Sequence, residues 1–125
     1  MTIAQNLPAE LSKVMEQLSE AWASANPDRV MAVMTEDCVY EASVGPEPGR
    51  TFRGAVELRA GLEKMFAHDG AARTEITDVF GVGDRVAWEW HYYDTAGNLL
   101  ARGCDLFVVR NGRIARKNAF RKTAA

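Results

Sequence analysis

The sequence predicts an α+β fold, in which helices from the first half of the chain pack on a curved, antiparallel sheet built mainly from the second half. Two observations support this prediction. Apolar residues recur at spacings of three and four in two stretches before residue 70, as in amphipathic helices. After residue 73 they alternate with polar residues and are interrupted by tight turns, which favours consecutive antiparallel strands over a βαβ arrangement.

Three helices are predicted in the first half. The first covers residues 7–25, where one face carries Leu7, Leu11, Val14, Leu18, Trp22 and Ala25. Asn26-Pro27-Asp28 then offers a capping residue, a proline suited to a first turn and an acid near the positive helix end, so a short helix should run to about Met34. A third helix is predicted from about Gly54, with its inward positions at Ala55, Leu58, Leu62, Met65 and Phe66.

Strands are predicted between and after these helices. Residues 38–44 are β-prone enough for a short strand, and residues 74–80 alternate as a longer one. Two hairpins complete the sheet. Their strands are residues 86–93, 99–109 and 113–122.

Length and charge limit the function classes. A chain of 125 residues with 47% hydrophobic content is the size of one domain with one core, so we expect a single domain over residues 1–125. The net charge of −2, with acids and bases interspersed, does not suit a nucleic-acid partner.

The cysteines and the hydropathy indicate the compartment. Cys38 and Cys104 are far apart and lack a CxxC or Cys/His cluster, so neither a disulfide framework nor a zinc site is predicted. No segment approaches the roughly 18 apolar residues of a membrane span, and the N-terminus lacks a signal-peptide pattern. We therefore expect a cytoplasmic protein that has no membrane partner, metal or other cofactor.

Three short motifs, together with the order of elements, resemble the nuclear transport factor two-like superfamily. The motifs are Thr35-Glu36-Asp37-Cys38-Val39, Phe52-Arg53-Gly54 and Asn111-Gly112-Arg113-Ile114. The superfamily includes ketosteroid isomerases, SnoaL-like polyketide cyclases and scytalone dehydratase, and the resemblance covers nearly the whole chain. It implies a cone, in which a curved, mixed or antiparallel sheet wraps around three helices as a cystatin-like α+β roll with a ligand cavity inside.

The resemblance to ketosteroid isomerases carries over to one catalytic position. Asp105 falls where those enzymes keep a protonated aspartic acid that donates to the developing oxyanion. Their general base falls on Ala42 and their oxyanion tyrosine near Leu18, so the resemblance does not imply steroid isomerisation by that machinery. A slip of one residue in the first strand would turn Glu41 inward, which makes Glu41 the second catalytic candidate.

The turn between the first two hairpin strands decides what faces Asp105. A two-residue turn at Ala96-Gly97 would set Trp88 opposite Asp105, whereas a three-residue turn would set Trp88 beside Cys104. We prefer the first register, because it places three polar side chains together on the opposite face of the hairpin. They are Glu89, His91 and Arg102.

The last hairpin leaves a second alternative open. A three-residue loop over 110–112 would put Lys117, Ala119 and Arg121 on the face of Asp105. A tight Asn111-Gly112 turn would instead present Arg116, Asn118 and Phe120. Alone in an apolar wall, Asp105 would favour its neutral form and act as an acid or hydrogen-bond donor. With Lys117 beside it, Asp105 would stay ionised.

Three functional hypotheses follow. The first is a cofactor-independent isomerase, lyase or cyclase that uses acid–base chemistry on a hydrophobic ring substrate. The second is a binding protein without turnover, and the third is a dimeric accessory protein that pairs through the outer sheet face. The candidate ligand-binding residues are Trp22, Tyr40, Leu62, Trp88, Trp90, Tyr92, Phe107 and Lys117.

Overall fold

The computed structural model describes residues 7–44, 50–69 and 73–123. Within these ranges the chain forms three helices and six strands. The helices are α1 (Ala9–Ala23), α2 (Pro27–Met31) and α3 (Gly54–Asp69). The strands are β1 (Met34–Glu41), β2 (Thr51–Arg53), β3 (Arg73–Val82), β4 (Arg85–Tyr93), β5 (Leu99–Arg110) and β6 (Arg113–Thr123).

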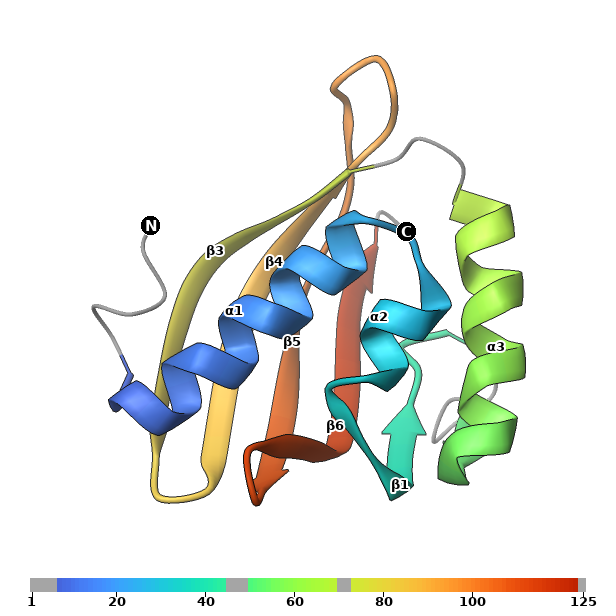
Figure 1. Cartoon of the computed structure of the whole chain (residues 1–125). Helices are drawn as coiled ribbons and strands as arrows, with labels where there is room; N and C mark the ends of the chain where they lie inside the picture. Colours follow the sequence, from blue (N-terminus) through green and yellow to red (C-terminus); the bar gives the residue numbers. More distant parts are fainter. Residues whose placement is uncertain (1–6, 45–49, 70–72, 124–125) are drawn as a thin grey trace.

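All six strands join one sheet in the order β2-β1-β6-β5-β4-β3. The β1–β6 pair is parallel and the other pairs are antiparallel, so the sheet is mixed. The helices cover one face of the curved sheet, with α1 crossing in front of the central strands and α3 standing beside β1 (Figure 1). The predicted α+β roll is therefore confirmed.

The core lies between the helices and the inner face of the sheet. From α1 it takes the predicted apolar face, and from α3 it takes Leu58 and Leu62, which are fully buried. A large buried side chain on the sheet side is Phe107 of β5. The helical spacing in the sequence therefore identified most inward residues correctly, but the predicted Ala25 lies beyond α1 and is exposed, and the buried Met15 and Ala21 were not predicted.

The boundary between α2 and β1 differs from the prediction. The Asn26 side chain caps α2 as expected, by accepting a hydrogen bond of 2.9 Å from Asp28 N. The helix nevertheless ends at Met31, because the chain from Val33 pairs with β6 through a 2.8 Å bond from Ile114 N to the Val33 carbonyl. This pairing with a distant strand starts β1 earlier than the local β propensity predicts.

Two further strand features were not predicted. Residues 51–53, expected only to open the third helix, form the edge strand β2 against β1. In β3 the register shifts between Ile76 and Asp78, so the simple alternation expected over 74–80 is wrong. As a result Val79 is buried and Phe80 lies on the outer face.

The β4–β5 hairpin reaches the preferred register by a different route. Asp94 N bonds to the Asn98 carbonyl, so the loop has three residues and the predicted two-residue turn is wrong. The pairing then shifts by one residue between Tyr92 and Tyr93. This bulge cancels the longer loop, and Trp88 lies opposite Asp105 as predicted.

The β5–β6 hairpin shows the same compensation. Asn111 and Gly112 form a tight turn with φ values of 52° and 75°, the alternative that was expected to present Asn118. Ala115, however, has no partner in the pairing, so the register shifts by one residue. The side chain that reaches the inner face is therefore Lys117, as in the other alternative.

Candidate active site

Asp105 lies in the interior of the roll. The residue is only 3% exposed, and both of its carboxylate oxygens accept hydrogen bonds from indole rings of β4. Trp88 Nε1 donates to Oδ2 at 2.7 Å, and Trp90 Nε1 donates to Oδ1 at 2.9 Å. The alternation of β4 aims both rings at the same face, and the register described above brings the carboxylate between them.

Lys117 of β6 supplies the positive charge beside this carboxylate. Its Nζ lies 3.7 Å from Asp105 Oδ2 and donates to Tyr40 Oη at 3.3 Å. It also lies 3.9 Å from the ring centroid of Trp22 and 4.6 Å from that of Tyr40. Burial by itself lowers the pKa of Lys117, but the Tyr40 oxygen and the Asp105 carboxylate outweigh burial and raise it above its ordinary value.

These contacts favour one charge state of the pair. The groups that approach Asp105 are two indole N–H groups and an ammonium, all of which donate and none of which accepts. An ionised carboxylate matches them, whereas a protonated one would present a hydrogen without an acceptor among these neighbours. Of the two alternatives, the ionised Asp105 beside Lys117 fits this geometry, and the neutral hydrogen-bond donor does not.

The room that Gly103 leaves opposite the indoles is filled by one of them. A Cβ placed on Gly103 would lie 2.7 Å from Trp90 Cε2, closer than real Cβ contacts allow. Gly103 therefore serves to let the Trp90 ring lie flat against β5. The space beside Gly103 is therefore not available to a ligand.

Small side chains lie beside Asp105 on the inner face of the neighbouring strands. Ala119 of β6 pairs with Asp105 of β5, and Ala42, directly after β1, follows the Tyr40–Lys117 register to the same level. Both alanines face inward, and Ala119 is 9% exposed whereas Leu62 in the core is 0% exposed. We call Ala42, Ala119, Asp105 and Lys117 the inner strip.

Arg121 closes the inner strip on the side away from Lys117. It faces inward two residues after Ala119, and its Nε donates to Ser43 Oγ at 3.1 Å. Its guanidinium carbon lies 5.5 Å and 5.6 Å from the ring centroids of Trp90 and Tyr92. Neither Arg121 nor the alanines were among the predicted site residues, although strand alternation from Lys117 indicates all of them once the register is known.

The other predicted ligand residues separate into two groups. Leu62 and Phe107 are fully buried core residues, the latter in an edge-to-face contact with Trp88 at 4.9 Å. Tyr92 and Trp22 are half-buried at the margin of the cluster, where Trp22 contacts Phe66 with ring centroids 5.1 Å apart. The core pair is therefore enclosed by packing, whereas the two half-buried rings are partly exposed.

Glu41 does not turn inward. Tyr40 and Ala42 occupy the inner face of β1, so alternation sends Glu41 to the outer face. There its carboxylate pairs with Arg116 Nη2 at 2.9 Å. The slip that would have made Glu41 a catalytic candidate is therefore absent, and its placement beside Asp105 was wrong.

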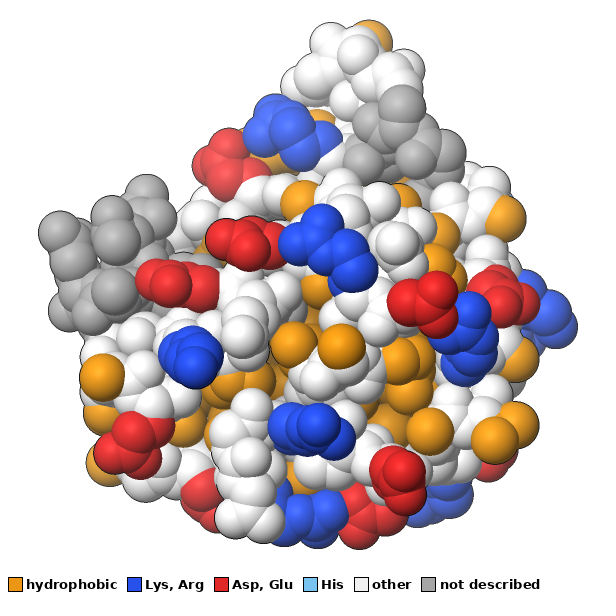
Figure 2. Space-filling model, in the orientation of Figure 1, with side chains coloured by type: hydrophobic (Ala, Val, Ile, Leu, Met, Phe, Trp, Pro, Cys, Tyr) orange, Lys and Arg blue, Asp and Glu red, His pale blue; other side chains and the backbone are white. Residues whose placement is uncertain are grey.

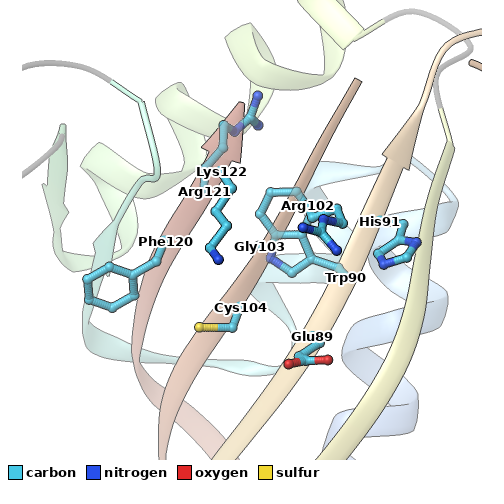
Figure 3. Close-up of a pocket in the computed structure, with 9 residues that line it drawn as sticks. All are labelled: Glu89, Trp90, His91, Arg102, Gly103, Cys104, Phe120, Arg121 and Lys122. Atoms are coloured by element: carbon cyan, nitrogen blue, oxygen red, sulfur yellow. The ribbon is translucent and has the colours of Figure 1, made fainter. Parts of the chain in front are cut away.

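The outer face of the sheet carries a separate hollow of about 430 Å³ (Figure 3). Its lining includes Glu89, His91, Arg102, Cys104 and Phe120 on strands β4, β5 and β6, on the side away from the helices. Burial and the nearby carboxylates raise the pKa of the Cys104 thiol, so the thiol is protonated and a poor nucleophile at neutral pH. This hollow is a surface depression without an activated group.

A metal site is absent from the part of the chain that the structure describes. No group of three His, Cys, Asp or Glu side chains there is arranged to hold a metal ion. Within the same ranges, no helix combines the length and apolar character that crossing a membrane requires. On the helix side, positive and negative side chains are interspersed, with hydrophobic side chains visible between them (Figure 2).

Comparison with solved structures supports the roll. An NTF2-like protein of unknown function from Mesorhizobium loti has 24% identity and a TM-score of 0.78, over 94% of this chain and 98% of that one. A candidate polyketide cyclase from Sinorhizobium meliloti has 17% identity and a TM-score of 0.72, over 86% and 93% of the two chains. A candidate ketosteroid isomerase from Kribbella flavida has 15% identity and a TM-score of 0.75, over 90% and 78%.

These structural similarities show the fold alone. A comparison with curated protein sequences found no match. The model of the SnoaL-like domain, in contrast, matches residues 15–117, which include Asp105, Lys117 and most of the sheet. By this match, the chain belongs to the SnoaL-like domain family.

Proposed function

We propose that the protein binds a small hydrophobic ring compound on the inner strip and performs acid–base chemistry on it, as a cofactor-independent isomerase, lyase or cyclase. The observation that carries this proposal is the buried Asp105–Lys117 ion pair. Removing two charges from water costs several kcal/mol per ion, and a well-packed hydrophobic pair is often at least as stable. Perturbed, buried ionisable groups are concentrated at functional sites instead.

Lys117 would polarise an oxygen of the ligand. Its ammonium has three N–H groups, and its contacts with Tyr40 Oη and Asp105 Oδ2 use two of them. The third can donate to a carbonyl oxygen that lies over Ala119. A cation at this position stabilises negative charge as it develops on that oxygen during enolisation.

Asp105 would act as the base in this scheme. As an ionised carboxylate it can accept a proton from the carbon next to the polarised carbonyl and return the proton to another carbon of the ligand. Its two indole donors hold it in place. Two proteins of the same fold are named a candidate polyketide cyclase and a candidate ketosteroid isomerase, and chemistry of this class agrees with those names.

A ligand screen tests the proposal. Ring ketones, epoxides and polyketide-like aromatics are added to the protein, since a ligand that binds the native state raises its melting temperature by mass action. Ala119→Val, which narrows the inner strip and retains both charges, should abolish the shift. Ala60→Val, on the exposed side of α3, is the matched control and should retain it.

The screen also separates enzyme from binding protein. Compounds that raise the melting temperature are incubated with the protein and followed by NMR. Conversion by the wild type that Lys117→Met abolishes supports the enzyme, whereas stable binding without conversion favours the ligand-binding alternative. If no compound of these classes binds, the proposed function is wrong.

A second proposal concerns the outer face, which we infer is the surface of a homodimer. Phe80, Leu106 and Phe120 are 61%, 48% and 51% exposed, and the first two lie in one row across strands β3 to β5. On the same face Glu89 lies in the next row and Arg102, of opposite charge, in the row after it. In a two-fold interface the same patch meets itself, so the acid of one copy can pair with the base of the other.

Size-exclusion chromatography with light scattering tests the dimer. Leu106→Glu should give a monomer, because it places an unpaired charge in the centre of the apolar row. Val56→Glu is the matched control, since Val56 is 86% exposed on α3 and lies outside the proposed interface. A wild-type monomer would refute the dimer without affecting the ligand site.

We also propose that residues 1–125 form one domain, since all six strands join a single sheet. The cytoplasmic location stays a prediction that rests on the use of cysteine. Cys38 and Cys104 are both free thiols.

A further inference from the structure

Arg121 lies at the end of the inner strip that is farther from Lys117. It shares the inner face of β6 with Lys117 and follows it by four residues, which is about 13 Å along a strand. Ala119, which has a small side chain that is 9% exposed, lies between them. A ligand lying on the inner strip would therefore meet one cation at each end.

The guanidinium of Arg121 is held in place without an acidic partner. Its Nε is occupied by Ser43 Oγ, and its flat face lies near the rings of Trp90 and Tyr92. Among the described residues no carboxylate lies within 4.0 Å of it, whereas Arg59, Arg110 and Arg116 each pair with one. Its two terminal amino groups can therefore bind an anion in the paired geometry that arginine offers a carboxylate.

The charges of the site favour an anionic ligand. Lys117 and Asp105 neutralise each other, so the charges of +1, −1 and +1 from Lys117, Asp105 and Arg121 sum to +1. A ligand with one carboxylate would bring the site to neutrality. The remaining lining is apolar or aromatic and suits a ring.

We propose that the ligand of this site is a ring compound that carries a carboxylate, and that Arg121 binds this carboxylate while the ring lies over Ala119. This inference rests on the proposed function, because it assigns the substrate class of the same site. It makes Arg121 a specificity-determining residue. A neutral ring compound would occupy the strip more weakly.

Matched acid and amide probes test the inference. Benzoate with benzamide, and 2-naphthoate with 2-naphthamide, are titrated into the wild type, Arg121→Gln and Arg113→Gln by calorimetry at neutral pH. Arg113→Gln removes the same charge from the distant β5–β6 turn. The melting temperature of each variant without ligand is measured first, so that a folding defect is recognised.

The expected result is that the wild type binds the acid of at least one pair about tenfold or more tightly than its amide, as a hydrogen-bonded charge pair predicts. Arg121→Gln should remove this preference, and Arg113→Gln should retain it. Equal binding of acid and amide by the wild type would overturn the role of Arg121 and leave the ligand site in place. Failure of every probe to bind would overturn the proposal that the ligand is a ring compound with a carboxylate. The uncharged ketones and epoxides of the ligand screen then decide separately whether the site binds any ligand.

Discussion

Replacement of Lys117 by methionine tests the central feature of the structure, the buried ion pair. Methionine keeps most of the length and apolar stem of lysine but removes the ammonium. Asp105 would then be a buried carboxylate with two indole donors and no cation. We expect the protein to lose about 3–5 kcal/mol of unfolding free energy, the usual effect of removing one partner of a buried ion pair.

The magnitude follows from the distances. Two unit charges 3.7 Å apart attract by about 4 kcal/mol at an effective dielectric constant of about 20. The contacts of the ammonium with the Trp22 and Tyr40 rings contribute about 1–2 kcal/mol more. Removing the ammonium also removes its own desolvation cost, which offsets part of this sum and brings the loss back to the range above.

Urea denaturation followed by tryptophan fluorescence measures the loss. With a denaturant dependence of about 2 kcal/mol per molar urea, the midpoint of Lys117→Met should fall by about 2 M. Lys122→Met, an exposed lysine on the same strand, is the matched control and should change stability by less than about 0.5 kcal/mol. Lys117→Met/Asp105→Asn should lose less than the sum of its single variants, because each removes the charge that the other leaves unpaired.

A loss below about 1 kcal/mol for Lys117→Met would refute this reasoning, since a carboxylate that tolerates the loss of its cation is not desolvated. A double variant that loses the full sum would refute the coupling between the two side chains. The first result would also remove the main support for the proposed function.

Three further predictions concern the same cluster. The pKa of Lys117 in the folded protein is raised above 10.5, so the stability that its charge contributes is fully present below that pH and is lost as the pH rises through the folded pKa. The melting temperature of the wild type should therefore fall more steeply above pH 10.5 than that of Lys117→Met. Parallel curves for the two proteins would contradict this. Gly103→Ala should cost about 2–4 kcal/mol in urea denaturation, because the added methyl overlaps the backbone carbonyl of Phe120 and the Trp90 ring and so weakens the bond of that ring to Asp105; an unchanged midpoint would contradict the close approach of both groups to Gly103. Trp90→Phe keeps a ring but removes the donor, and should cost about 1–3 kcal/mol by the same assay; a stabilised variant would argue against an ionised Asp105.

The hairpins show how far local reasoning reaches. In the first hairpin the predicted inward residue was right although the predicted turn was wrong, because a bulge compensated for the longer loop. In the second hairpin two alternatives were left open, and the structure combines the turn of one with the inward residue of the other. Asn111-Gly112 does adopt the tight turn that its φ preferences favour. The unpaired Ala115 then returns Lys117 to the face of Asp105.

The first strand illustrates the opposite case. Its β propensity predicts a start near Cys38, and a slip of one residue was compatible with the sequence. The parallel pairing with β6 begins β1 at Met34 and sends Tyr40 inward and Glu41 outward. A partner strand more than 70 residues away in the sequence thus decided that Glu41 lies on the outer face.

Apart from the edge strand β2, the order of helices and strands was determined by the sequence alone, as were most of the inward face of α1 and the aromatic face of β4, since helical and strand periodicity are local properties of the chain. The tertiary structure decided the partner of Asp105, the outward side of Glu41 and the position of Arg121. A strand repeats every two residues, so one unpaired residue inverts every side chain that follows it. Whether a strand contains such an unpaired residue depends on its pairing with neighbouring strands and on the packing of their side chains. This information is not present in the sequence of the strand itself.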